Sequence, residues 1–174
     1  MPAKEILVLG NPALRTRCAP VRRADAADVL KDADDLRDTL DAFRKEHGFG
    51  RGIAAPQIGL TRRIVFISVD RLLAMINPVI VRRSRRMFTL WDDCFSLPDL
   101  LAKVKRHVTV EVQYQDPSGK TRTVRAEGGL SELLQHEIDH LDGILMIDRA
   151  IDSRHIVYRS EFEKRFGTKG PPAL

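Results

Sequence analysis

Two histidines four residues apart are the most chemically suggestive feature of the chain, in the segment His136-Glu137-Ile138-Asp139-His140. Side chains four positions apart lie on one face of a helix, so both imidazoles can reach a single ion. Glu137 would lie beside a water on that ion without being a ligand. A divalent ion with an open position lowers the pKa of its water, and a nearby carboxylate can accept the proton. The spacing therefore predicts a hydrolase with His136 and His140 as metal ligands and Glu137 as the acid/base.

The same helix also has a purely structural interpretation, because this spacing occurs by chance in many helices. Its apolar residues are candidate core contacts, namely Leu133, Leu134, Ile138 and Leu141. Two histidines on a buried face need a reason to be there. The motif alone leaves both interpretations open.

A third ligand must come from elsewhere, because residues 142–150 contain no histidine. The candidates are Cys94, His47, His107 and His155. A thiolate at Cys94 suits a soft site with two imidazoles, whereas a buried structural thiol is the alternative for this residue. With only Cys18 besides it, no disulfide framework is expected, although one bridge stays open.

Two helices and several strands must position these residues. A helix is predicted for 25–47, ended by Gly48, from apolar residues at helical spacing, which are Val29, Leu30, Leu36, Leu40 and Phe43. A second helix runs from about Gly128 to Leu141, with Gly143 as its cap. Residues 1–24 are predicted to be an irregular arm, and 48–60 a glycine-rich loop.

Strands are predicted for 63–69, 74–81 and 104–114, and the turn Asp116–Gly119 leads into a returning strand at 121–126. Helix, strands and helix in this order favour an α+β fold. The length of 174 residues fits a single domain spanning 1–174, with a frayed tail at about 166–174.

The net charge of +5 and the pI of about 9.5 suit an anionic partner such as RNA or the ribosome surface. A merely solvated basic surface is the alternative. The basic residues cluster at 82–86 and between Arg154 and Lys169. No segment has the roughly 20 apolar residues that span a bilayer, so a cytoplasmic protein without a membrane or DNA partner is expected.

Three ordered motifs resemble those of the peptide deformylases. Gly50–Gln57 matches G-x-G-x-A-A-P-Q, and Gln135–Gly143 matches Q-H-E-x-D-H-L-x-G. Asp92–Ser96 stands in the place of E-G-C-L-S, and the segment Leu9–Arg15 is also similar. The resemblance covers residues 5 to 150.

The resemblance implies antiparallel β-sheets packed around a central C-terminal helix. It also implies a metal held by Cys94, His136 and His140: Fe(II), for which Zn, Ni or Co can substitute. Glu137 would be the acid/base, while the Gln57 amide and the Phe95 backbone N–H would donate to the oxyanion. The backbone at Gly50 and Gly52 would approach an extended substrate.

Five residues depart from the family pattern, all in the expected substrate-binding region: Arg51, Asp92, Asp93, Phe95 and Glu132. Glu132 lies one helical turn before His136, beside Leu133, which still offers an apolar wall. One hypothesis is that Asp93 and Glu132 favour a cationic or polar formylated substrate. The other is an ion pair of Arg51 with Glu132 or Asp93 that leaves the specificity unchanged.

The leading functional hypothesis is removal of the N-formyl group from N-formylmethionyl peptides of nascent bacterial proteins. The alternatives are a deformylase for another formylated substrate, an ordinary zinc peptidase, and a non-catalytic, metal-stabilised binder of modified N-termini. The basic C-terminal segment provides a candidate contact with the ribosome.

Overall fold

The computed structural model describes residues 3–22, 26–69 and 72–167. Its helices are α1 (Ala26–His47), α2 (Gly128–Leu141) and α3 (Arg159–Phe166), with short 3₁₀ turns η1 (Pro12–Arg15), η3 (Ala55–Ile58), η4 (Met146–Arg149) and η5 (Ser153–His155). Its strands are β1 (Gly52–Ala54), β2 (Ile64–Ser68), β3 (Leu72–Arg83), β4 (Met87–Asp93), β5 (Leu100–His107), β6 (Thr109–Gln115), β7 (Thr121–Glu127) and β8 (Ile156–Tyr158).

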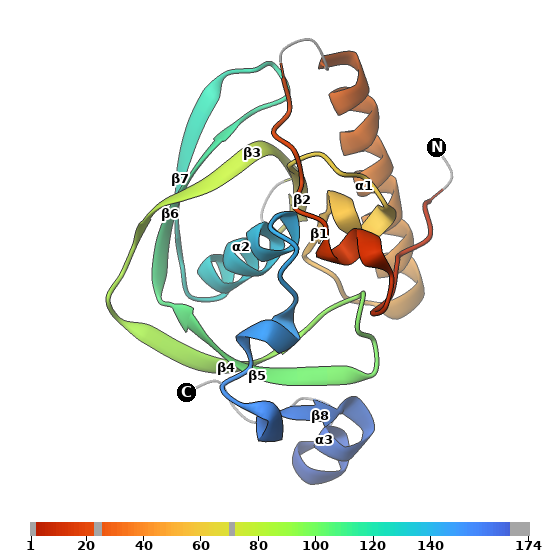
Figure 1. Cartoon of the computed structure of the whole chain (residues 1–174), viewed down its shortest axis with the longest axis vertical. Helices are drawn as coiled ribbons and strands as arrows, with labels where there is room; N and C mark the ends of the chain where they lie inside the picture. Colours follow the sequence, from red (N-terminus) through yellow and green to blue (C-terminus); the bar gives the residue numbers. More distant parts are fainter. Residues whose placement is uncertain (1–2, 23–25, 70–71, 168–174) are drawn as a thin grey trace.

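Two antiparallel sheets enclose α2 (Figure 1). The larger has the strand order β1-β2-β3-β6-β7, and the smaller has the order β4-β5-β8. The predicted α+β fold, with antiparallel sheets around the helix that carries the histidines, is confirmed.

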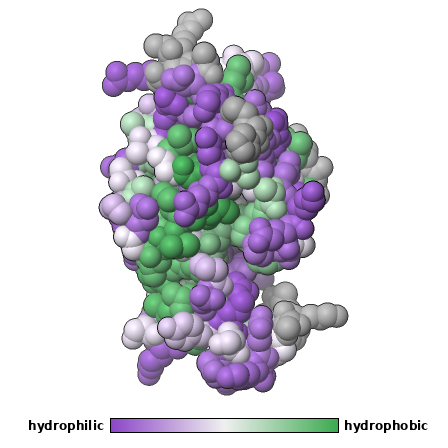
Figure 2. Space-filling model, turned by 90° about the vertical axis from the view of Figure 1, so that its right-hand side faces the viewer, coloured by the Kyte–Doolittle hydropathy of each residue, from purple (hydrophilic) through white to green (hydrophobic). Residues whose placement is uncertain are grey.

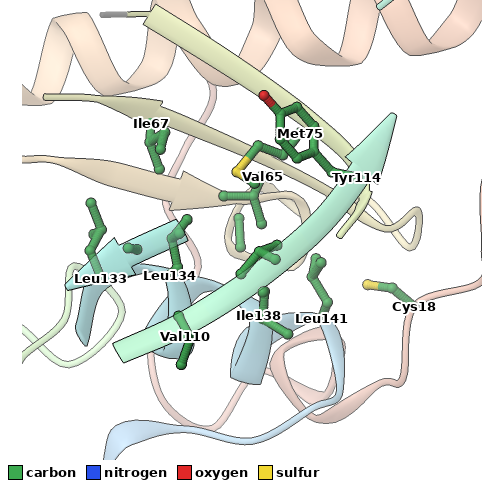
Figure 3. Packing of buried hydrophobic residues seen from close by; sticks show 13 residues of the cluster. Cys18, Val65, Ile67, Met75, Val110, Tyr114, Leu133, Leu134, Ile138 and Leu141 are labelled. Carbon is green, nitrogen blue, oxygen red and sulfur yellow. The ribbon is translucent and has the colours of Figure 1, made fainter. Parts of the chain in front are cut away.

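The core between α2 and the larger sheet uses the apolar face that the sequence predicts. Figure 3 shows Leu133, Leu134, Ile138 and Leu141 of α2 beside residues of the sheet that include Val65 and Val110. This face of the helix is therefore committed to packing. His136 and His140 lie on a different part of the helix surface, and every residue from Ser131 to Leu141 is buried.

On the other face of the larger sheet, α1 covers β1 and β2. Because side chains alternate along a strand, Ile64 and Phe66 of β2 pack towards α1, whereas Val65 and Ile67 pack towards α2. All five residues of β2 are buried for this reason. Leu36 and Leu40 of α1 complete the second core.

Leu30, one of the apolar residues at helical spacing in α1, does not belong to the core, because this side chain is 51% exposed. Its neighbour Val29, at the same helix face as Leu36, is buried instead. Figure 2 shows the side of the molecule on which α1 lies, and hydrophobic residues there run from the middle to the lower left among hydrophilic ones. Apolar residues at helical spacing thus include one that faces solvent.

The predicted single strand at 104–114 is wrong, because β5 and β6 belong to different sheets. The chain passes from one sheet to the other at Val108, whose N–H donates to Arg86 O and whose carbonyl accepts from Gly128 N. The predicted loop at 48–60 also contains β1 and η3. Local alternation of apolar residues cannot reveal β1 or the change of sheet between β5 and β6, because both depend on pairing with strands that are distant in the sequence.

The segment after η4 forms β8, which is the edge strand of the smaller sheet, and α3, and the sequence pattern predicts neither element. Phe162 of α3 packs edge-on against Trp91 of β4, with ring centroids 5.0 Å apart. Of the predicted frayed tail at 166–174, residues 168–174 lie outside the described part. Among the described residues, no helix is long and apolar enough to cross a membrane.

Candidate metal centre and active-site cavity

Three buried side chains, two from α2 and one from the residue after β4, converge on one point. The Cys94 Sγ lies 3.2 Å from His140 Nε2, which in turn lies 3.2 Å from His136 Nε2. Cys94 follows β4 directly, and the histidines are one turn apart on α2. Both cysteines of the chain are free thiols, so no bridge involves Cys94. The helix spacing and the end of β4 together create a compact cluster of one sulfur and two nitrogen donors.

The other three histidines lie in different surroundings. His107 Nδ1 contacts the carbonyl of Ser84 at 2.7 Å, and His155 Nδ1 contacts Asp152 at 2.9 Å. His47 is exposed at the end of α1, where its ring lies 4.2 Å from that of Phe43. Of the candidates for a third ligand, the structure brings only Cys94 to the two motif histidines.

A layer of buried charges orients the first histidine. Asp92 accepts from His136 Nδ1 at 2.9 Å and from Arg106 Nη2 at 3.1 Å, and Arg106 also pairs with Asp139. Burial would raise the pKa of Asp92, but His136 and Arg106 outweigh it and lower that pKa to about 2. A carboxylate on Nδ1 leaves Nε2 of His136 facing the cluster, which is the usual arrangement behind a metal-bound histidine.

This donor set fits a divalent metal ion. Burial lowers the pKa of His140 well below its usual value, so its imidazole is neutral, as a metal ligand requires. Burial also opposes the charge on His136, but Asp92 raises its pKa in the absence of an ion. Three protein ligands are typical of a catalytic site that keeps one position open for substrate or water.

A second group of possible ligand atoms overlaps the first, formed by Asp92, Glu132 and His136. Both carboxylates already have guanidinium partners, Arg106 for Asp92 and Arg51 for Glu132. The Cys94 cluster is free of such partners, and its soft donors are the better match for a transition metal.

Glu137 lies beside this cluster as a buried carboxylate. Its Oε2 has no hydrogen-bond partner among the described residues, and burial raises its pKa to about 7. Gly52 of β1 packs directly against it, since a Cβ at that position would lie 2.8 Å from Glu137 Oε1. A carboxyl group that titrates near neutral pH is suited to accept and return a proton.

Gln57 presents its amide nitrogen to the same place. Its Oε1 accepts from the backbone N–H of Ala54 at 2.8 Å, which fixes the orientation of the amide. The Nε2 then lies 3.6 Å from Cys94 Sγ and 3.3 Å from Ser96 Oγ. A fixed donor beside the cluster can stabilise negative charge that develops on a substrate oxygen.

A cavity of about 180 Å³ opens onto these groups. Its lining includes every predicted substrate-binding residue except Asp92, together with Gln57, Cys94, Phe95, His136, Glu137 and Phe49. His140 and Asp92 lie behind this lining; Asp92 is buried, and the prediction that it contacts substrate is not supported by its position. We call Arg51, Asp93 and Glu132 the charged rim.

Both acids of the charged rim have arginine partners. Arg51 donates to Glu132 Oε2 at 2.7 Å and to the carbonyl of Gly129 at 3.1 Å. Asp93 accepts from Arg159 of α3 at 3.0 Å. Of the two ion pairs considered from the sequence, the structure contains Arg51–Glu132, while Asp93 pairs with a residue that sequence reasoning missed.

Sequence reasoning also missed Arg106, Ser96 and Phe49. Arg106 had a detectable signal, because it occupies an inward position of β5 in line with Ala102 and Val104. A charged residue at such a position needs a buried partner. Phe49 carried no comparable signal, since its place beside Phe95, with ring centroids 6.4 Å apart, depends on the fold.

Comparisons with known proteins agree with this geometry. The family model described as polypeptide deformylase matches residues 3–155. A peptide deformylase of Rhizobium meliloti is 37% identical over the whole of both chains, and one of Agrobacterium fabrum is 41% identical over 85% of this chain and 87% of its own.

Solved structures lead to the same family. A peptide deformylase of Synechococcus elongatus in complex with actinonin has a TM-score of 0.81 at 30% identity, covering 89% of this chain and 82% of its own. A peptide deformylase of Thermus thermophilus has a TM-score of 0.79 at 34% identity, covering 94% of this chain and 92% of its own. The chain belongs to the polypeptide deformylase family.

Proposed function

We propose that this hydrolase holds a divalent metal ion with Cys94, His136 and His140 and removes the formyl group from N-formylmethionyl peptides. The convergence of these three buried donors beside Glu137 is the observation that supports the proposal most strongly. Neither Glu137 nor Gln57 is needed merely to hold a metal, so their presence in the same cavity favours catalysis over a structural site.

The ion would act as a Lewis acid that makes water nucleophilic near neutral pH. Glu137 accepts the proton of the attacking water at its carboxylate and later delivers it to the departing amine nitrogen. Its buried position excludes bulk water from this transfer, and its pKa near 7 suits both directions.

Gln57 and Phe95 stabilise the oxyanion that forms as water adds to the formyl carbon. Gln57 donates from Nε2, and its hydrogen bond from Ala54 keeps that nitrogen aimed at the cavity. We assign the second donor to the backbone N–H of Phe95, whose ring is held by stacking on Phe43 at 3.9 Å. Fixed donors of this kind often make one of the largest contributions to catalysis.

The substrate chain lies along the Gly50–Gly52 segment in this proposal. Gly50 has a φ of +133°, and a Cβ there would meet Phe95 and Arg44 at 3.1 Å. A side chain at Gly50 or Gly52 would displace Phe95 or Glu137, both of which line the cavity. Leu133 supplies an apolar wall for the first side chain of the peptide.

We assign Fe(II) as the ion in the cell, with Zn, Ni or Co able to substitute. One thiolate and two imidazoles accept all four ions, so the ligands alone permit the substitution. We also treat residues 1–174 as a single catalytic domain, since the C-terminal α3 reaches the rim of the cavity through Arg159.

A ribosome contact through the basic C-terminal segment is a separate part of the proposal. Arg154 and Lys164 are exposed there, but each has an acidic partner, Asp152 and Glu161 respectively. These local pairs reduce the free positive charge, so the contact would be weak. Co-sedimentation with ribosomes that fades as salt is raised supports it, and no co-sedimentation at low salt removes it.

The function is tested with protein loaded anaerobically with Fe(II). Formate release from formyl-Met-Ala-Ser is expected, with no release of acetate from the matched acetylated peptide. A protein that binds the formyl peptide tightly but releases no formate would be a binder, and the hydrolase proposal would be wrong.

A further inference from the structure

The Arg51–Glu132 pair places two charges on the wall of the catalytic cavity. The Glu132 side chain is only 5% exposed, whereas that of Arg51 is 49% exposed. Arg51 reaches from the edge of β1 to the first turns of α2, where it bonds both Glu132 and the Gly129 carbonyl.

This pair lies close to the reacting groups. An oxygen of Glu132 is within 4.8 Å of a ring nitrogen of His136, and both residues line the cavity together with Glu137. A formyl carbon placed beside the metal ligands puts the first Cα of the substrate only two bonds from that carbon. The side chain on this Cα must therefore point along the cavity wall, part of which is the Arg51–Glu132 pair.

The pair presents hydrogen-bonding groups rather than a net charge. Glu132 is balanced by Arg51, and Asp93, the other acid of the charged rim, is balanced by Arg159. A cationic side chain would thus find no unpaired acid on this rim. Charge selection, one of the hypotheses drawn from the sequence, has little support from this arrangement.

A thioether and a hydroxyl interact differently with such a wall. Methionine packed against the pair would remove water from both charges without replacing its hydrogen bonds, which costs free energy. A short side chain with a hydroxyl or amide can donate to Glu132 or accept from Arg51 and so replace that water. Leu133 offers methionine an apolar surface on only one part of the cavity.

We propose that the Arg51–Glu132 pair determines the specificity for the first residue, and that formylated peptides with a short polar first side chain are hydrolysed as efficiently as formylmethionyl peptides. The inference rests on the proposed formyl-amide hydrolysis and names a wider substrate class for the same site. The two residues act by contact with the substrate side chain, not through the metal.

The first test compares kcat/KM for formyl-Ser-Ala-Ser and formyl-Met-Ala-Ser with the Fe(II) enzyme. The inference expects the serine peptide to equal or exceed the methionine peptide. A preference of about tenfold or more for methionine overturns it while leaving the hydrolase proposal intact. No formate from either peptide would instead contradict the hydrolase proposal, and the inference with it.

The second test uses the variant Arg51→Ile/Glu132→Ile, which replaces the pair by apolar side chains. The ratio of kcat/KM should shift towards the methionine peptide by at least about tenfold. Glu132→Gln keeps a polar wall, so its ratio should stay within about threefold of the original. An unchanged ratio in the double variant overturns the inference.

The control variant is Arg62→Leu/Asp32→Leu. It removes an ion pair of similar exposure, 33% for Arg62 and 6% for Asp32, which does not line the cavity. The ratio should be unchanged in this control. Should the double variant of the rim fail to fold, the wild-type ratio and Glu132→Gln still decide the inference.

Discussion

The two walls of the cavity are built differently. The catalytic wall, formed by Gln57, Cys94, His136 and Glu137, is buried, and a further layer of side chains such as Asp92 and Arg106 orients it. In the charged rim, Arg51 and Asp93 are partly exposed and Glu132 is buried, and two ion pairs, each with a partly exposed arginine, stabilise it. Catalysis needs side chains in fixed positions. The paired residues of the rim can be substituted without displacing the proposed metal ligands.

This contrast explains where the chain departs from its family pattern. Asp92 keeps the carboxylate that His136 requires, so this substitution within the catalytic layer is conservative. Arg51 and Glu132 also depart from the family pattern, and they form an ion pair with each other. The residue that positions His136 therefore preserves its chemistry, and the residues of the charged rim do not.

Removal of the acid/base should have the largest effect. Glu137→Ala is expected to lower kcat by about 10³-fold or more, because Glu137 Oε2 is a buried carboxylate oxygen without a hydrogen-bond partner among the described residues and can take up a proton. Formate release and metal content are measured on the same sample. The metal content should be unchanged, since Glu137 is not a proposed ligand; retained activity would remove Glu137 from this role.

Loss of the charge behind His136 should have a smaller but clear effect. Asp92→Asn keeps the size of the side chain but weakens its interactions with His136 and Arg106. Metal affinity should fall by about 10- to 100-fold, as measured by competition with a chelator. Activity should return at excess metal. An affinity equal to that of the wild type would show that the buried layer does not support the site.

The buried carboxylate of Glu137 should also cost stability in the metal-free protein. Burial raises its pKa to about 7 from 4.5, so between these values the folded state holds a proton that the unfolded chain releases. Below pH 4.5 the group is protonated in both states and does not destabilise the folded protein. As the pH rises through 7, the buried group ionises and the free energy of unfolding falls.

Glu137→Gln removes this pH dependence. Relative to the wild type, the metal-free variant should gain on the order of 2 kcal/mol at about pH 8 and little at about pH 4.5. Urea unfolding at the two pH values measures the difference, with the exposed Glu46→Gln as the control. A gain that is equal at both pH values would mean that ionisation of Glu137 is not its source.

The outer ion pair of the rim should have the smallest effect. Asp93→Ala breaks the pair with Arg159, whose side chains are 47% and 32% exposed. Exposed pairs contribute at most about 1 kcal/mol, so kcat/KM should change less than about threefold and stability little. A decrease in kcat/KM as large as the decrease that Asp92→Asn causes would contradict the distinction between the two walls.

Local sequence patterns predict those parts of the site that lie within one element. The spacing of His136 and His140 places both on one helix face, and the apolar residues of the same helix indicate which face enters the core. The strong turn at Asp116–Gly119 likewise predicts the β6–β7 hairpin. Each of these follows from backbone geometry over a few residues.

Contacts between residues far apart in the chain follow from the packing of the elements and not from any local pattern. The passage from β5 to β6 between sheets, the approach of Cys94 to His140, and the partners of Asp93 and Arg106 depend on contacts far apart along the chain. The choice between Arg51–Glu132 and Arg51–Asp93 was open for the same reason. Side-chain periodicity reports the face of one element, but an ion pair requires two elements to be placed against each other.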